Sequence, residues 1–144
     1  MTKIFVSSVI NAPVEKVWQT IGDFEAVADW NPVIPESSIE NFEASDTVGC
    51  VRHLTMPSGA KIREKLIALS YDEHMYKYSI IKAPMPVENY EGKLRLLPIT
   101  DGNRTYVEWS SEFDVPKGEE ADVVAEITGI YISGLDALKR KFGG

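Results

Sequence analysis

Two oppositely charged residues fall on the apolar faces of two consecutive predicted strands. These strands flank a turn at residues 57–59, and strand side chains alternate between two faces. Arg52 and Glu64 each share a face with mainly apolar neighbours, namely Cys50, Leu54 and Met56, and Ile62, Leu66 and Ala68. An unpaired buried charge costs several kcal/mol. We therefore expect both charges to point inward and to need each other or a polar ligand, in a hairpin register that the pattern leaves open.

Two interpretations of this pair compete. It is either a structural ion pair that helps to set the strand register, or a polar anchor or acid–base pair at the end of an apolar pocket. In the second case Glu64 would move a proton and Arg52 would stabilise developing oxyanion charge. The tyrosines predicted on the same inner wall favour a pocket, because buried hydroxyls also need partners. Tyr90 is the candidate proton donor among them.

The remaining wall of the predicted pocket is apolar and aromatic. The same alternation places side chains of several strands inward, and helical spacing adds two more from the C-terminal segment. Trp30, which lies near two prolines, Pro32 and Pro35, is predicted at the pocket entrance. The predicted ligand contacts are Trp30, Leu54, Ile62, Tyr76, Tyr78, Trp109, Ile127 and Tyr131.

The elements that position these residues follow a simple order. Residues 3–10 favour a strand, and a helix from Pro13 to Gly22 and a second short helix ending at Trp30 follow it. Residues 37–115 consist of strands separated by short turns, so that about seven antiparallel strands are expected. From residue 119 to 142 the pattern is helical, with acidic residues at the start and basic ones at the end.

These elements predict an α+β fold. The last helix would be about 35 Å long, and one curved antiparallel sheet must bury its inner face against it. A gap between the sheet and the helix is where a ligand can lie. The length predicts one domain over residues 1–144, with no internal repeat or linker.

Composition excludes several classes of protein. The net charge of −7 argues against nucleic acid and anionic membrane surfaces as partners. No stretch is apolar enough for membrane insertion and no signal peptide is visible, so we expect a cytoplasmic protein. A single cysteine, Cys50, excludes an intramolecular disulfide. Neither zinc-ligand spacing nor a glycine-rich phosphate loop occurs, so we expect no metal and no cofactor.

Five motifs resemble the START/Bet v 1-like (SRPBCC) superfamily, and within it the polyketide cyclase/dehydrase-like branch. They are residues 11–18 (NAPVEKVW), 29–32 (DWNP), 49–52 (GCVR), 63–66 (REKL) and 107–110 (VEWS). The resemblance implies the helix-grip fold, a curved seven-stranded sheet around a long C-terminal helix, with a cavity for small or lipid-like apolar molecules. The sequence is also similar to plant lachrymatory factor synthases. That similarity implies a functional pair at Arg52 and Glu64 and a functional tyrosine at Tyr90.

Three functions are consistent with these residues. The first is binding of a small hydrophobic or amphipathic molecule in the internal cavity. The second is a cofactor-free lyase, isomerase or cyclase that uses Arg52, Glu64 and Tyr90. The third is a protein-interaction module, which would expose an apolar patch instead of enclosing a pocket. The sequence identifies neither the ligand nor the oligomeric state.

Overall fold

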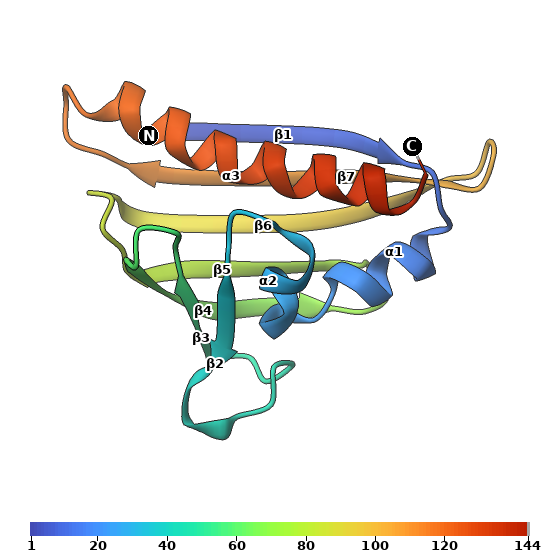
Figure 1. Cartoon of the computed structure of the whole chain (residues 1–144), viewed down its shortest axis with the longest axis horizontal. Coiled ribbons are helices and arrows are strands. Elements are labelled where there is room, and N and C mark those ends of the chain that lie inside the picture. The colour runs from blue at the N-terminus through green and yellow to red at the C-terminus, as the bar shows by residue number, and fades with distance from the viewer. Residues whose placement is uncertain (144) are drawn as a thin grey trace.

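The computed structural model describes residues 1–143 and contains one antiparallel sheet and three α-helices (Figure 1). The elements are β1 (Thr2–Ile10), α1 (Val14–Ile21), the 3-10 turn η1 (Phe24–Ala26), α2 (Val27–Trp30), β2 (Glu36–Ile39), the 3-10 turn η2 (Glu40–Phe42), β3 (Val51–Thr55), β4 (Lys61–Ser70), β5 (Met75–Lys82), β6 (Glu88–Ile99), β7 (Arg104–Asp114) and α3 (Glu120–Lys141). The sheet has seven strands in the order β1-β7-β6-β5-β4-β3-β2. The predicted α+β architecture is confirmed.

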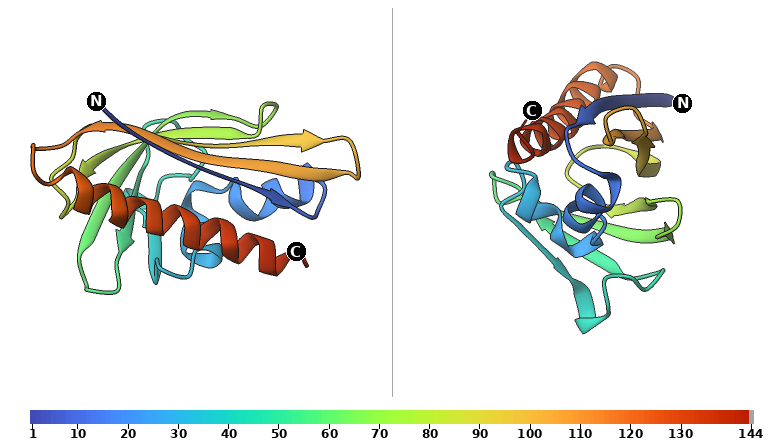
Figure 2. Two further views of the ribbon diagram at one scale, coloured as in Figure 1. Left: turned by 90° about the horizontal axis from the view of Figure 1, so that it is seen from above. Right: turned by 90° about the vertical axis from the view of Figure 1, so that its right-hand side faces the viewer.

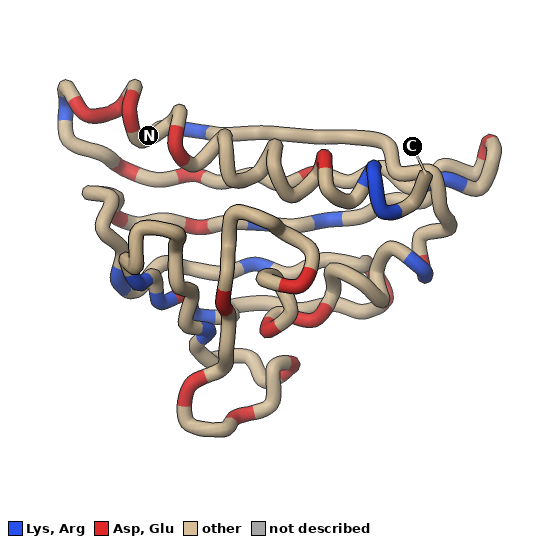
Figure 3. The backbone as a smooth tube through the Cα atoms, viewed as in Figure 1, with Lys and Arg blue, Asp and Glu red and all other residues tan. Residues whose placement is uncertain are grey.

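The long helix α3 lies across the concave side of the sheet (Figure 2). Its inward side chains recur at helical spacing, and the fully covered ones are Val123, Ile127, Tyr131, Leu135 and Leu138. Acidic residues occupy its first turn and basic residues its last (Figure 3), the charge order that a helix dipole favours. No helix among the described residues has both the length and the apolar character needed to cross a bilayer.

The two helices between β1 and β2 close one end of the molecule. In α1, Val17, Trp18 and Ile21 are buried, as the spacing predicts. The helix ends at Gly22, where a Cβ atom would lie 2.5 Å from the Trp18 side chain, so only glycine fits. The segment after α2 is tied to α3, because the buried Asn31 donates a hydrogen bond of 3.1 Å to the Ile130 carbonyl.

A notch in α3 receives the aromatic side chains beneath it. At Gly134 a Cβ atom would come within 2.8 Å of the Trp30 side chain and 3.0 Å of the Trp109 side chain. The two indole rings pack on each other with their centroids 5.5 Å apart. Because Gly134 has no side chain, the helix can approach the sheet closely here. This contact sets the distance between the helix and the sheet, and with it the height of the cavity between them.

Strand alternation predicts the inner face of the sheet correctly except at one place. A register shift in the pairing of β4 with β5 falls between Leu66 and Ala68. Beyond it, Leu69 lies opposite Tyr76 and packs against the core. The prediction that Ala68 continues the inward set of Leu66 is therefore wrong, because an irregularity in pairing changes the parity of every later residue.

Candidate functional site

The inner face of β3 and β4 carries a buried ion pair. Arg52 and Glu64 are direct cross-strand partners, and Nε of Arg52 lies 2.7 Å from Oε1 of Glu64. The two residues are 1% and 6% exposed. The inward placement predicted from alternation is confirmed, and the register that the sequence left open brings the two charges together.

The guanidinium of Arg52 is held almost entirely by the protein itself. Its Nη1 donates hydrogen bonds to the Phe24 carbonyl at 2.9 Å and to the Tyr76 hydroxyl at 3.4 Å. Its central carbon lies 4.0 Å from the ring centroid of Phe24 and 4.9 Å from that of Tyr78, which is cation–π distance. Arg52 is thus enclosed by aromatic rings and held in one orientation.

The carboxylate of Glu64 is less fully bonded than the guanidinium of Arg52. Its Oε1 accepts the hydrogen bond from Arg52, and Oε2 has no hydrogen-bond partner within residues 1–143. Burial raises the pKa of Glu64 above its ordinary value of 4.5, and attraction and a hydrogen bond from Arg52 offset part of that rise. Burial disfavours the charge on Arg52, but the attraction of Glu64 holds its pKa above the ordinary value, so Arg52 stays protonated.

Aromatic hydroxyls gather on the β5–β7 side of the interior, beneath α3. The Tyr78 hydroxyl accepts a hydrogen bond of 2.9 Å from Nε1 of Trp109, and the Tyr90 and Tyr131 hydroxyls are hydrogen-bonded to each other. The rings of Trp109 and Tyr131 are stacked with centroids 4.3 Å apart. Burial raises the pKa of Tyr131 to about 12, so this phenol is neutral near pH 7 and can donate a hydrogen bond.

A cavity of about 30 Å³ separates the ion pair from these hydroxyls. Every predicted site residue except Trp30 and Tyr76 lies on its wall. The complete lining is Ile34, Arg52, Leu54, Met56, Ile62, Glu64, Tyr78, Ile80, Met85, Tyr90, Trp109, Ile127, Ile130 and Tyr131. A cavity needs about 10–15 Å³ of such space for each water, so this one has room for two or three waters at most and the interior is nearly filled by the protein's own side chains.

The predicted positions of Trp30 and Tyr76 in the pocket are wrong. Trp30 is 5% exposed and lies behind Trp109 in the Gly134 notch, instead of at an entrance. The reason is the Asn31 hydrogen bond to α3, which draws the end of α2 under the helix. Tyr76 lies behind the ion pair, where its hydroxyl meets Arg52 and its ring meets the edge of Phe24.

Five lining residues are not among the predicted ligand contacts, namely Ile34, Met56, Ile80, Met85 and Ile130. Met85 is the most informative, because it sits between two prolines in the β5–β6 connection and is only 8% exposed. The prolines mark this segment as a turn, and a turn is normally solvent-exposed. A long apolar side chain at the tip of such a turn is the signal that could have identified it.

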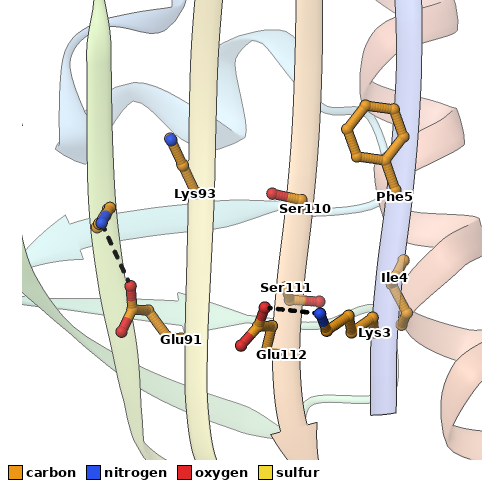
Figure 4. A pocket seen from close by; sticks show the side chains of 9 residues that line it. Lys3, Ile4, Phe5, Glu91, Lys93, Ser110, Ser111 and Glu112 are labelled. Carbon is orange, nitrogen blue, oxygen red and sulfur yellow. Dashed lines mark ion pairs between the residues drawn. The ribbon is translucent and has the colours of Figure 1, made fainter.

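A larger hollow lies on the outer, convex face of the sheet (Figure 4). It encloses about 380 Å³, and four of its five charged side chains form two ion pairs across strands at the protein surface. Nζ of Lys3 lies 3.6 Å from Glu112, and Nζ of Lys77 lies 3.6 Å from Glu91. Exposed pairs of this kind form on any solvated sheet face, so the inner cavity with its enclosed charges is the better candidate site.

Comparison with known proteins agrees with this architecture. The family model described as polyketide cyclase/dehydrase and lipid transport matches residues 1–143. The abscisic acid receptor PYL7 of Arabidopsis thaliana is 30% identical over an alignment of 118 residues, and the match covers 78% of this chain and 54% of the receptor. The chain thus spans about half the length of that curated relative.

Two solved structures are similar over nearly the whole chain. The protein XoxI of Bacillus cereus has a TM-score of 0.89 at 37% identity, covering 99% of this chain and 96% of its own. An uncharacterised protein of Bacillus thuringiensis has a TM-score of 0.88 at 36% identity, covering 99% and 100%. The curved sheet, the long helix across it and the match over residues 1–143 lead to one conclusion: the chain belongs to the polyketide cyclase/dehydrase and lipid transport family, within the START/Bet v 1-like superfamily.

Proposed function

We propose that this protein binds a small hydrophobic or amphipathic molecule in the cavity between the sheet and α3. The observation that carries the proposal is a buried charged pair whose carboxylate faces an otherwise apolar and aromatic wall. Ligand sites combine a mainly apolar lining with a few fixed polar groups. For stability alone, a well-packed apolar pair at these positions would serve as well or better.

The ligand must enlarge the cavity in order to enter it. Drug-sized ligands occupy pockets of roughly 300–1,000 Å³, and the cavity measures about 30 Å³. Met85 lines this cavity and also an outer groove of about 200 Å³ between the β5–β6 connection and the start of α3. Methionine is flexible and repacks readily. Rotation of Met85 would join the two spaces and open a route from solvent.

A Met85→Ala variant tests binding directly. Purified wild type, Met85→Ala and a control, Met75→Ala, are screened against small apolar and amphipathic molecules by thermal shift and native mass spectrometry. Met75 is partly buried and lies outside the cavity lining. A bound ligand stabilises the folded state by an amount that grows with the logarithm of its concentration over its dissociation constant, so we expect larger shifts for Met85→Ala, which binds more tightly, than for the other two proteins. No binding to wild type or Met85→Ala across the panel would reject the proposal.

A second candidate function is a cofactor-free lyase, isomerase or cyclase. One observation favours it: the only hydrogen bond found for the Glu64 carboxylate within residues 1–143 goes to Oε1, and burial raises the pKa of this carboxyl, which favours uptake of a proton by a general base. Because Nε and Nη1 of Arg52 are hydrogen-bonded to Glu64, Phe24 and Tyr76, Arg52 would orient the base. Donation to a developing oxyanion would then come from Tyr90, with Tyr131 beside it.

The test of catalysis is Glu64→Gln. The amide keeps the shape of the carboxylate and its contact with Arg52 but cannot take up a proton. If Glu64 is the base, turnover of a substrate found in the ligand screen should fall by roughly 10²–10⁴-fold, while the dissociation constant changes little. Equal turnover by the two proteins would show that the site binds its ligand without this acid–base role.

A further inference from the structure

Four basic residues lie close together on the outer face of β4 and β5, the face opposite to the cavity. The outer basic patch, as we call it, consists of Lys61, Arg63, Lys65 and Lys82. The first three are alternate residues of β4, so they point away from the cavity-facing Ile62 and Glu64 between them. The fourth is the direct cross-strand partner of Arg63 on β5. Figure 3 shows these basic positions grouped where β4 begins and β5 ends.

Most charges of this patch lack an acidic partner. Nε and Nη2 of Arg63 donate hydrogen bonds of 2.7 and 2.9 Å to the Glu40 carboxylate. The three lysines are exposed and form no ion pair within residues 1–143. Lys61 donates a hydrogen bond of 2.8 Å to the neutral hydroxyl of Thr55. The patch therefore keeps a net positive charge in a chain whose total is −7.

The crowding of like charges is unfavourable in the free protein. Arg63 has Lys82 directly opposite it, and like charges that face each other across two strands destabilise a sheet. The patch residues before and after Arg63 on β4 lie roughly 7 Å away along the strand. Elsewhere on the same face, the ammonium groups of Lys3 and Lys77 each pair with a glutamate. An anionic partner would relieve the repulsion that the chain itself leaves in the patch.

The shape of the patch favours an extended anionic chain. Lys61 and Lys65 are separated by roughly 13 Å of strand, a length that an extended chain spans and a single phosphate or carboxylate does not. Alternate side chains of an extended peptide recur with the same spacing as those of a strand, so carboxylates at alternate positions can follow the row. The exposed Ile67 follows two residues after Lys65, and the exposed Ile81 precedes the β5 member of the patch. Both offer apolar contact to such a peptide.

A nucleic acid fits the patch less well than a peptide does. Proteins that bind single strands combine a basic groove with aromatic side chains on which the bases stack. The cross-strand partners of the patch residues include no Phe, Tyr or Trp; they are Val51, His53, Thr55, Ser79 and Lys82. A long polyanion would also extend over the rest of an acidic chain, whereas a short acidic segment touches only the patch.

We propose that the outer basic patch binds an acidic, extended segment of a partner protein. The ammonium groups of Lys61, Lys65 and Lys82 pair with carboxylates of the segment, and Arg63 keeps its bonds to Glu40. The inference goes beyond the proposed function, because the patch lies on the other face of the sheet from the cavity. Ligand binding in the cavity and docking on the patch can therefore fail independently.

Three probes test this assignment by NMR titration at low salt. The first is an end-blocked peptide of alternating glutamate and serine, the second has glutamine in place of each glutamate, and the third is an oligothymidylate of the same charge as the first. We expect the glutamate peptide to bind more tightly than the other two and to shift resonances of β3, β4 and β5. Added salt should weaken its binding, because exposed charges are screened.

Two triple variants with the same change in net charge locate the effect. The patch variant combines Lys61→Gln, Lys65→Gln and Lys82→Gln. The control variant replaces three exposed lysines of other elements, Lys16→Gln, Lys117→Gln and Lys141→Gln. Because one exposed ion pair changes affinity by about 2- to 5-fold, the patch variant should bind the glutamate peptide about 10- to 100-fold more weakly. The control variant should lose less than about 3-fold.

Thermal unfolding of the two variants without any probe tests the repulsion itself. The patch variant should have a higher Tm than the control variant, because only the patch variant loses crowded like charges. A lower Tm would show that these lysines are already satisfied in the free protein and would overturn the inference. So would failure of the glutamate peptide to bind wild type, or equal losses in the two variants. Tighter binding of the oligothymidylate would also overturn it, and would assign the patch to a nucleic acid instead.

Discussion

Two cross-strand ion pairs of this protein have nearly the same geometry and opposite surroundings. Arg52 and Glu64 face each other on β3 and β4 at 2.7 Å, and Arg95 and Glu108 face each other on β6 and β7 at 2.8 Å. The side chains of the inner pair are 1% and 8% exposed, whereas those of Arg95 and Glu108 in the outer pair are 36% and 11% exposed, so the contrast lies in the two arginines. The distance between the charges is therefore not what distinguishes the two pairs.

Burial gives the two pairs different physical consequences. The outer pair is screened by water and salt and contributes about 0–1 kcal/mol to the free energy of unfolding. The inner pair has lost its hydration, so each charge depends on the other and on the aromatic rings around Arg52. A charged pair retained inside an apolar wall contributes little net stability but offers a polar contact to a ligand, which supports the proposed binding site.

The largest expected effect comes from replacing the arginine of each pair in turn. Arg52→Met should lower the free energy of unfolding by about 3–5 kcal/mol, because Glu64 is left buried without its partner. Arg95→Met should cost less than about 1 kcal/mol. Urea denaturation of both variants measures the contrast, and the double variant Arg52→Met/Glu64→Leu should recover most of the loss. Equal costs for the two single variants would show that burial does not separate the pairs.

The two faces of α3 give the next test, with one glycine on each. Gly134→Ala should destabilise the protein by about 1–3 kcal/mol, because the added methyl group would press on Trp30 and Trp109. Gly129→Ala meets no atom within 4 Å and should stabilise by up to about 1 kcal/mol through helix propensity. Thermal unfolding measures both changes. A neutral Gly134→Ala would mean that the helix shifts without cost and that the notch does not set the cavity height.

Two adjacent serines on β7, one buried and one exposed, allow the same comparison of burial for single hydroxyl groups. Ser111→Ala removes a buried hydroxyl that lacks a partner and should stabilise the ligand-free protein by about 1 kcal/mol, which raises Tm by roughly 2–8 °C. Ser110 points to the outer face (Figure 4), so Ser110→Ala should stay within about 0.5 kcal/mol of wild type. Differential scanning calorimetry resolves the two effects. A destabilised Ser111→Ala would show that this hydroxyl is satisfied in the free protein.

The pH dependence of two carboxyl groups is the smallest expected effect. Burial raises the pKa of Glu64 above 4.5, and the hydrogen bond from Arg63 lowers the pKa of Glu40 below 4.5. The contribution of Glu40 to stability is therefore present above its ordinary pKa and lost as pH falls through its folded value. That of Glu64 is present below its ordinary pKa and lost as pH rises through its folded value. Carbon-13 NMR titration of both carboxyls should show a lower midpoint pH for Glu40 than for Glu64. A lower midpoint for Glu64 would contradict this prediction.

Local patterns account for much of the fold and for part of the site. The period of two places Arg52, Glu64, Tyr78 and Tyr90 inward, and helical spacing places Tyr131 there, because side-chain direction depends only on the local backbone. The same argument is wrong beyond Leu66, where one irregular pairing changes the parity. It also cannot identify Met85, whose burial depends on how the β5–β6 connection folds against α3.

The sequence by itself determined which side chains face inward, where most elements begin and end, and that two opposite charges share the interior. Only the tertiary structure decided that those charges pair directly, that Arg52 is enclosed by Phe24 and Tyr78, and that Trp30 lies behind the wall instead of at an entrance. The physical reason is the range of the interactions. Side-chain direction is set by neighbouring residues, whereas the cavity and the aromatic side chains on its wall come together only where β5, β6, β7 and α3 meet, and no local pattern predicts that contact.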